Sequence, residues 1–182
     1  MMPFAHLRHN PCRIATTCCV AASLWLFLAC AHAQSGVRHA DVERELKQER
    51  FQQVLELSQK ALTDRPRDPQ MRFWYALALD KTGQMQAAFH HYQALTQDHP
   101  ELPEPHNNLG VLLLRMGRMD EAQAAFQMAL RMDSGYAEAM ENMGDVLQWQ
   151  ARRWYEKSLQ SGWARPALKQ KINALPPLPQ PQ

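Results

Sequence analysis

Histidine side chains are the first candidates for acid–base or metal chemistry, and they are scattered along this chain. Beyond residue 33 the sequence has five of them: His39, His90, His91, His99 and His106. His90 and His91 are adjacent, and adjacent residues of a helix point about 100° apart, so this pair cannot hold one metal from one face. The sequence has no H-E-x-x-H motif and no two histidines four residues apart. We therefore expect structural or solvated histidines and no metal site.

Nucleophilic catalysis has no pattern in the sequence either. It contains no G-x-S-x-G and no phosphate-binding loop, and its serines show no link to a histidine–acid pair. The acidic pair Asp120–Glu121 suits the positive end of a helix dipole in an expected first turn. The sequence therefore predicts a protein that is not an enzyme and needs no cofactor. A small helical hydrolase or transferase is the alternative, and His90 or His106 in a closed pocket beside a carboxylate would favour it.

The first 33 of the 182 residues have the pattern of a secretory signal peptide. Arg8 and Arg13 precede an uncharged apolar run over 20–31, which is shorter than the roughly 20 residues that span a bilayer. Ala31-His32-Ala33 then provides small residues for cleavage after Ala33. We expect a periplasmic protein that starts at Gln34.

Two alternatives for this leader stay open. It could remain uncleaved as an anchor, or Leu26 to Cys30 could act as a lipidation motif that makes Cys30 the first residue of an outer-membrane lipoprotein. Apart from lipidation, we expect no membrane association. All four cysteines lie in the leader: Cys12, Cys18, Cys19 and Cys30. Cleavage after Ala33 removes them, so the mature chain would have no disulfide and no thiolate chemistry.

Charge excludes a further class of function. The leader contains Arg8 and Arg13 and no acidic residue, so the rest of the chain has 18 basic and 18 acidic residues. Nucleic-acid binding needs a clustered basic surface, which this balanced composition does not indicate. We expect no nucleic acid among the partners.

A pattern of small and large residues over 83–92 occurs again over 117–126. This repetition at a fixed interval predicts paired helices. Gly83, Met85, Ala88 and Tyr92 correspond to Gly117, Met119, Ala122 and Phe126. Leu109, Leu112, Leu113 and Met116 form the apolar stripe of one helix, and Ala122, Phe126, Ala129 and Leu130 form that of the next. Gly110 and Ala122 mark where these two helices approach closely, and Phe126 is expected to fill the space beside them. One helix pair cannot bury its own apolar faces, whereas stacked pairs can.

These residues resemble the tetratricopeptide repeat (TPR) family. The repeat over 103–136 has His106, Leu109-Gly110, Leu113, Ala122, Phe126, Ala129 and Ser134 at the family's positions, where His106 and Ser134 are departures. The repeat over 69–102 has Arg72, Tyr75-Ala76, Leu79, Ala88, Tyr92, Leu95 and Pro100. The resemblance implies an all-α, right-handed superhelical array of three to four helix pairs with a short C-terminal capping helix.

The resemblance also divides the chain into segments. We expect a degenerate N-terminal repeat over 34–68, full repeats over 69–102 and 103–136, and an atypical repeat over 137–160 with a shortened turn. For 137–160 we favour two helices with a very tight joint over a single bent helix. A capping helix within 161–175 would pack through Trp163 and Leu168, and the proline-rich tail over 176–182 would be extended and solvated.

In this family the first helices of the pairs line a concave groove that holds a peptide or a partner helix. The resemblance implies these groove positions: Phe73, Leu77, Asp80, Lys81, Asn107, Val111, Leu114, Arg115, Glu141, Asp145, Gln148 and Trp149. Leu77, Val111 and Asp145 stand where some members use an asparagine to clamp a carboxylate, so that specificity is not expected here. Lys81 and Arg115 could pair with an acidic group on a ligand or could be solvated helix ends. We therefore expect a protein-binding adaptor or assembly factor of the cell envelope, and its apolar groove residues also allow self-association.

Overall fold

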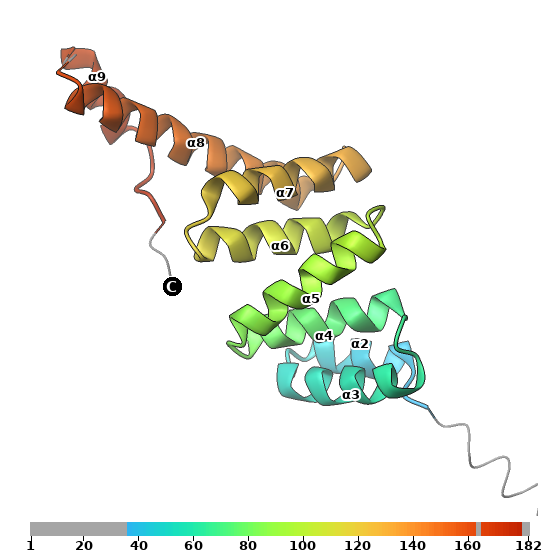
Figure 1. Cartoon of the computed structure of the whole chain (residues 1–182). Coiled ribbons are helices and arrows are strands. Elements are labelled where there is room, and N and C mark those ends of the chain that lie inside the picture. The colour runs from blue at the N-terminus through green and yellow to red at the C-terminus, as the bar shows by residue number, and fades with distance from the viewer. Residues whose placement is uncertain (1–35, 163–164, 180–182) are drawn as a thin grey trace, which may run out of the picture. The chain divides into compact units, whose positions relative to one another are not determined.

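The chain folds into antiparallel helix pairs that follow one another along the sequence. The computed structural model describes residues 36–162 and 165–179, and the leader, with its cleavage and lipidation sites, lies outside them. The helices in the described residues are α2 (His39–Lys47), α3 (Phe51–Asp64), α4 (Pro69–Lys81), α5 (Met85–Asp98), α6 (Pro103–Arg115), α7 (Met119–Met132), α8 (Ala137–Gln160) and α9 (Pro166–Asn173) (Figure 1). These residues include no strand.

The helices begin and end where the sequence changes its backbone preference. Asp68 caps α4 because its Oδ1 accepts a hydrogen bond from the Met71 backbone N–H at 3.1 Å, and Pro69 occupies the first turn, where no N–H is needed. Gly83 and Gly117 have φ values of 82° and 74° and end the turns after α4 and α6. Glu49, at the equivalent position one repeat before Gly83, has a φ of 54° in the turn between α2 and α3. The same turn is therefore used three times at the period of the repeat.

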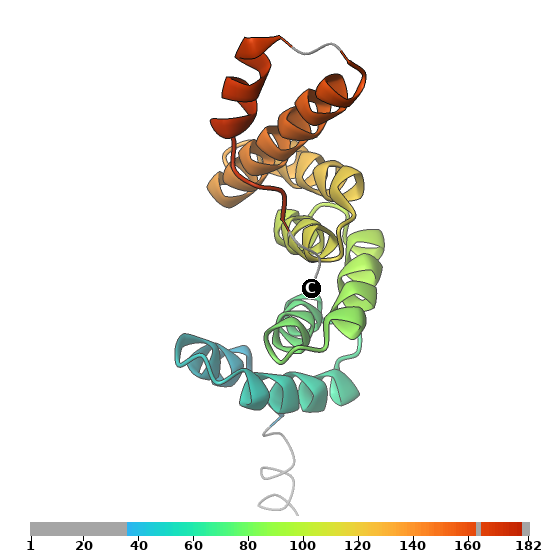
Figure 2. The ribbon, with the colours of Figure 1, turned by 90° about the vertical axis from the view of Figure 1, so that its left-hand side faces the viewer.

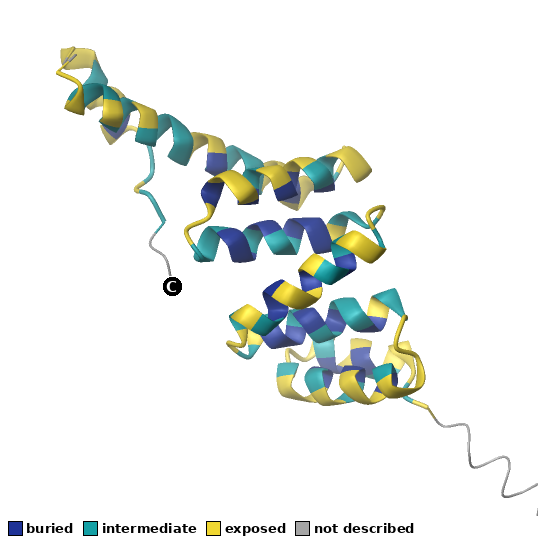
Figure 3. Cartoon of the chain, in the orientation of Figure 1, coloured by how far each residue is buried: buried dark blue, intermediate teal, exposed yellow. Residues whose placement is uncertain are grey.

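Neighbouring helices pack along the whole array. Contacts join each helix to the next, and α4 and α8 also contact the first helices of adjacent pairs, α2 and α6 (Figure 2). A smaller core around α2 to α4 contains Val42, Val54, Ala61, Met71, Trp74 and Ala78. A larger core extends from α4 to α8 and includes Tyr92, Leu112, Phe126 and Val146, which are fully buried. Buried positions are dense from α4 to α7 and sparse in the second half of α8 (Figure 3).

The close approach predicted at Gly110 is confirmed. A Cβ at this position would lie 2.5 Å from Cε1 of Phe126, so any larger residue would collide with the ring. The glycine thus lets α7 lie close to α6, and Phe126 is fully buried in the space beside it. The small and large residues of the repeat are two halves of one contact.

The prediction of two helices over 137–160 is wrong, because α8 is one helix of 24 residues. The position one repeat after Gly117 is Ala151, and alanine has the highest helix propensity whereas the turn favours glycine. Gln150, Arg152 and Arg153 around it are also compatible with a helix. The turn that ends α4 and α6 is therefore missing, and the helix continues in its place.

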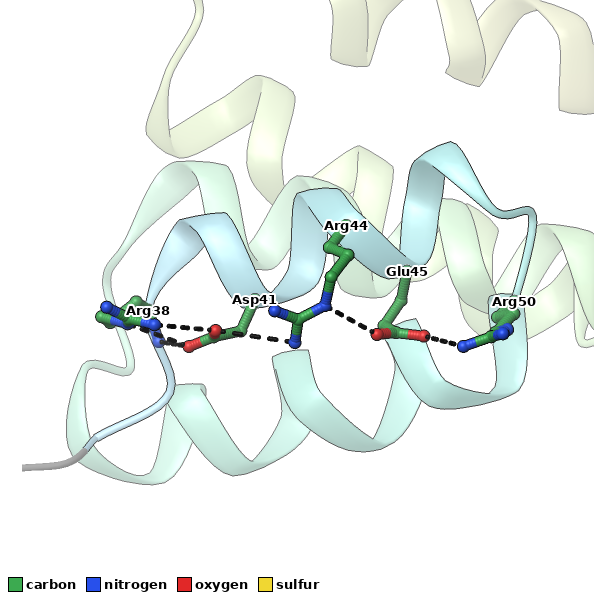
Figure 4. A network of polar contacts seen from close by, with 5 residues as sticks. All are labelled: Arg38, Asp41, Arg44, Glu45 and Arg50. Atoms are coloured by element: carbon green, nitrogen blue, oxygen red, sulfur yellow. Dashed lines mark hydrogen bonds and ion pairs between the residues drawn. The ribbon is translucent and has the colours of Figure 1, made fainter.

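The N-terminal edge of the array has a charged surface. Arg38 donates from Nη2 to Asp41 Oδ1 at 3.1 Å, and Arg50 donates from Nη1 to Glu45 Oε2 at 3.2 Å (Figure 4). Arg44 lies between these acids, with Nε 3.3 Å from Glu45 Oε1 and Nη2 3.7 Å from Asp41 Oδ1. This polar helix, α2, contributes Val42 to the smaller core, and its other buried residue, Glu45, is paired with Arg50.

At the other end, α9 lies within the expected capping segment. Ile172 is buried and Leu168 is half-buried, whereas Trp163, the other expected packing residue, lies outside the described residues. Among the residues that the structure describes, no helix combines the length and apolar content that crossing a bilayer requires.

Candidate partner-binding groove

A pocket of about 350 Å³ lies across the first helices of three successive pairs. Helix α4 contributes one wall, α6 the floor and α8 the other wall. The lining residues are Leu77, Asp80, Lys81, Asn107, Asn108, Val111, Glu138, Glu141 and Asn142. The repeat places them together because the first helices of the pairs lie side by side on one face of the array.

Asparagine amides form the polar part of this pocket. Asn142 donates from Nδ2 to Asn107 Oδ1 at 2.9 Å and thereby joins α8 to α6. Asn108 donates to the Tyr92 hydroxyl at 3.1 Å, so α5 helps to orient it. Asn107 is buried, whereas Asn108 and Asn142 are half-buried and line the open pocket. Amides of this kind can both donate to and accept from the backbone of an extended peptide.

The charges in the pocket are mainly acidic. Glu138 and Glu141 are exposed on α8, and the Arg115 guanidinium is paired with Asp80 from the neighbouring first helix. Lys81 is the exposed base of the lining. The Tyr136 hydroxyl donates to Glu138 Oε2 at 3.2 Å, and burial together with this carboxylate raises the pKa of Tyr136 to about 12. Tyr136 therefore stays neutral at ordinary pH and holds the carboxylate at the pocket rim.

The fold agrees with what comparisons with known proteins find. Two models of the tetratricopeptide repeat match residues 40–103 and 81–143, which together span the helices from α2 to the first turns of α8. The chain is a tetratricopeptide repeat protein. The all-α fold class predicted from the sequence is therefore confirmed.

Solved structures similar to this tetratricopeptide repeat protein share its superhelical fold. The crystal structure of MamA protein superposes with a TM-score of 0.54 at 17% identity, over 72% of this chain and 74% of that one. A second MamA structure, from AMB-1, gives 0.50 at 20% identity over 72% of each chain. A tetratricopeptide repeat protein from Parabacteroides merdae ATCC 43184 gives 0.55 at 16% identity, over 87% of this chain and 66% of that one. At these identities the likeness concerns the fold.

The structure brings some of the groove residues predicted for this repeat protein together and separates others. Leu77, Asp80, Lys81, Asn107, Val111 and Glu141 line the pocket. Leu114 and Trp149 pack against the larger core instead, and Arg115 is engaged by Asp80. Gln148 is exposed and Asp145 half-buried, and both lie outside the pocket. Phe73 contributes to both cores, where its ring centroid lies 6.0 Å from that of Tyr92, and lines a separate recess of about 180 Å³.

Three pocket residues were missed from the sequence: Asn108, Glu138 and Asn142. A signal for them exists, because Asn108 and Asn142 occupy one position of successive repeats, as do Glu104 and Glu138. Identical polar residues at one position of successive repeats indicate a shared surface role, since packing alone does not require them.

The proline-rich tail is not fully solvated, contrary to the prediction. Arg152 donates from Nη1 to the carbonyl oxygens of Ile172, Leu175 and Pro176 at 3.1, 2.9 and 3.3 Å. Leu175, Pro176, Leu178 and Pro179 are half-buried, and Leu178 packs against the larger core. The tail therefore returns from α9 past α8 toward α6 (Figure 2). Residues 180–182 lie outside the described part.

Neither histidine that would favour the enzyme alternative meets its condition in the described residues. His106 is buried and lines a pocket of about 310 Å³. Its Nε2 lies 3.1 Å from the Pro100 carbonyl oxygen, and no carboxylate contacts its ring. Glu121, in the same pocket, is paired with Arg118 at 2.6 Å. His90 is exposed beside Gln86. No group of histidines and acids in the described ranges has the arrangement of a metal site.

Proposed function

We propose that this repeat protein is a non-enzymatic binding module that holds an extended segment of a partner protein in the pocket between α4, α6 and α8. The observation that supports this proposal is the composition of that pocket. Amides from two helices face an open space that has two apolar lining residues, Leu77 and Val111, and an acidic rim. Extended peptides present unpaired backbone N–H and C=O groups that such amides can satisfy.

The charges indicate what kind of segment would fit. Glu138 and Glu141 are exposed on one wall, and Asp80 lies on the other beside Arg115. A lysine or arginine of the ligand, placed between the two walls, would meet more negative than positive charge. Leu77 and Val111 would contact an apolar neighbour of that residue. The proposed ligand is thus an extended segment with a basic residue next to an apolar one.

A peptide-binding assay tests this chemistry. Fluorescence anisotropy of labelled peptides that differ only in a central lysine, glutamine or glutamate should give the order lysine, glutamine, glutamate from tightest to weakest. Glu141→Lys should reverse or flatten that order, because it inverts a charge on the wall. Glu56→Lys is the matched control, since Glu56 is exposed on α3, away from the pocket. Equal binding of all three peptides, or an equal effect of both variants, would show that the acidic rim does not select the ligand.

The partner itself can be captured at the same place. A photoreactive residue at position 77 or 111, introduced in living cells, should crosslink the bound protein. The same residue at position 127, which is exposed on α7, should not. A captured protein whose crosslinked segment lacks a basic residue would contradict the proposed ligand class.

We further propose that the protein works in the periplasm as an adaptor or assembly factor, on the basis of its leader. Mass spectrometry of the purified protein tests this proposal. A free N-terminus at Gln34 would support cleavage after Ala33, whereas a diacylglyceryl group on Cys30 would indicate the lipoprotein. An intact N-terminus would indicate an uncleaved leader.

A further inference from the structure

Helix α8 presents an uncovered seam along its length. We define the seam as Met140, Gly144, Leu147, Ala151, Trp154 and Ser158, which are spaced alternately by four and three residues. This spacing places them on one face of a helix, as in a coiled coil. Met140, Leu147 and Trp154 are 48%, 50% and 66% exposed, and all three are large apolar residues.

The seam is the surface that a second helix covers in the preceding repeat. Gly110 of α6 faces Phe126 of α7. Gly144 occupies the same repeat position in α8, yet no side chain or other helix lies within 4 Å of the place where its Cβ would stand. Because α8 continues where a turn would be, no second helix within the described residues covers Met140, Leu147 and Trp154 on this face. Helix α9 contacts α8 elsewhere, through Arg152 and Tyr155.

The residues of the seam complement themselves when two copies are antiparallel. A two-fold axis level with Trp149 places Trp154 of each copy opposite Gly144 of the other. It also places Leu147 opposite Ala151, and Met140 opposite Ser158. Every layer then pairs a large side chain with a small one, as Phe126 and Gly110 are paired inside the repeat. A parallel pair would instead place two tryptophans in one layer and two glycines in another.

The charges of α8 favour the same orientation. Its first half contains Glu138, Glu141 and Asp145, and its second half contains Arg152, Arg153 and Lys157 with one acid, Glu156. Antiparallel packing brings the acidic half of one helix beside the basic half of the other, and it also opposes the two helix dipoles. We infer that the seam is a dimer interface and that its occupant is α8 of a second copy of this chain.

The size of the interface determines how the dimer should behave. The 19 residues from Met140 to Ser158 extend about 28 Å along the helix axis. The surface area that a single helix pair of this length buries falls at the lower end of the range for stable protein interfaces. The dimer should therefore dissociate on dilution. The pocket between α4, α6 and α8 uses another face of α8, so it stays open in the dimer.

Sedimentation velocity of the purified protein from about 1 to about 300 μM, a range that covers weak association, tests the interface. The parent should shift from monomer to dimer across this range. Gly144→Trp and Trp154→Ala should each weaken the dimer at least about tenfold, as loss of a central aromatic contact does. The double variant should dimerise again, because it exchanges the large and small members of one layer.

Controls keep the result interpretable. Met132→Ala removes an exposed apolar residue from α7, away from the seam, and should leave dimerisation unchanged. Circular dichroism should show parental helicity for each variant. If Gly144→Trp loses helicity, Leu147→Glu replaces it, since Leu147 is half exposed and its charge would face Ala151 of the second copy.

Three results would overturn the inference. The first is a monomer at every concentration, as expected if the seam is bare or binds a helix of another protein. The second is a dimer that both single variants leave unchanged. The third is a double variant that is no stronger than the singles, which would contradict the pairing of residues 144 and 154.

Discussion

Gly110 and Gly144 occupy the same position in two successive first helices, but their surroundings differ completely. A Cβ on Gly110 would collide with Phe126, whereas Gly144 has no such neighbour. Both helices start at matching positions of successive repeats, Pro103 and Ala137. The difference arises further along the chain, where α6 ends in a glycine turn and α8 continues.

This comparison shows that the first helix of a repeat does not determine whether the second exists. Gly117 has a positive φ and reverses the chain, so that α7 returns over Gly110. Ala151, at the equivalent position, continues the helix. The chain turns after α6 but continues as a helix through Ala151, and this difference separates a covered helix pair from a long helix with an open face. Three experiments test this comparison, and a fourth concerns the N-terminal end of the array.

The largest difference should follow from removal of the aromatic ring on each side. Phe126→Ala should lower the free energy of unfolding by about 3–5 kcal/mol, because it leaves a cavity in a fully buried site. Trp154→Ala, at a 66% exposed site, should change it by less than about 0.5 kcal/mol. Urea unfolding at low protein concentration measures both. Equal losses would show that α8 is covered in the monomer.

Steric substitution at the two glycines should give the next effect. Gly110→Leu should cost about 1–3 kcal/mol or more, because the new side chain overfills the contact between α6 and α7. Gly144→Leu should be tolerated by the monomer, since space is open there. Thermal melts of the two variants compare them directly. Overlapping melts for Gly110→Leu and the parent would exclude the close contact.

A smaller effect of opposite sign is expected for Gly144→Ala. Replacement of glycine by alanine inside a helix stabilises it by roughly 0.5–1 kcal/mol, and no neighbouring side chain opposes the added methyl group here. Urea unfolding should therefore shift to higher concentration. Gly110→Ala is the matched control and should shift it to lower concentration. A loss of stability in Gly144→Ala would indicate an atom against that face.

The smallest effect concerns the other end of the array, which is closed by charges. The Arg50 hydrogen bond, with a contribution from Arg44, holds the pKa of Glu45 below its ordinary value of 4.5. Because the folded pKa is depressed, the stabilisation is present above the ordinary value and is lost as pH falls through the folded pKa. As the pH is lowered below about 4.5, the melting temperature of the parent should therefore fall. The melting temperature of Glu45→Gln should fall less steeply over the same range. Parallel curves for parent and variant would mean that Glu45 does not contribute.

The sequence was sufficient where contacts repeat locally and insufficient where they do not. The spacing of Gly110, Ala122 and Phe126 predicted the helix pair because each contact recurs at a fixed distance along the chain. The same periodicity placed Leu77, Asn107 and Val111 in one pocket. This periodicity also led to the wrong prediction of a second helix over 151–159. Tyr155 and Leu159 have the spacing of a second helix, but Ala151 does not favour the turn that would precede it.

The tail was harder to predict because its contacts belong to no repeat. Arg152 binds the carbonyl oxygens of residues 20 to 24 positions later, and backbone acceptors of this kind leave no trace in residue types. Leu178 lies between prolines, whose composition indicates an extended chain but not where that chain lies. Likewise, the pairing of Asp80 with Arg115 depends on two helices whose relative rotation the sequence does not specify.

The pocket draws its walls from three helices that meet only when consecutive repeats are stacked, and this links occupancy to fraying. In a linear array the terminal units open most readily, and α8 has few buried residues to resist opening. A peptide that contacts both α4 and α8 would stabilise those units against opening. It would therefore slow amide hydrogen exchange in the first turns of α8. The affinity for the peptide would in turn decrease on warming before the central helices melt. The reason is that α8, which carries Glu138 and Asn142, would separate first.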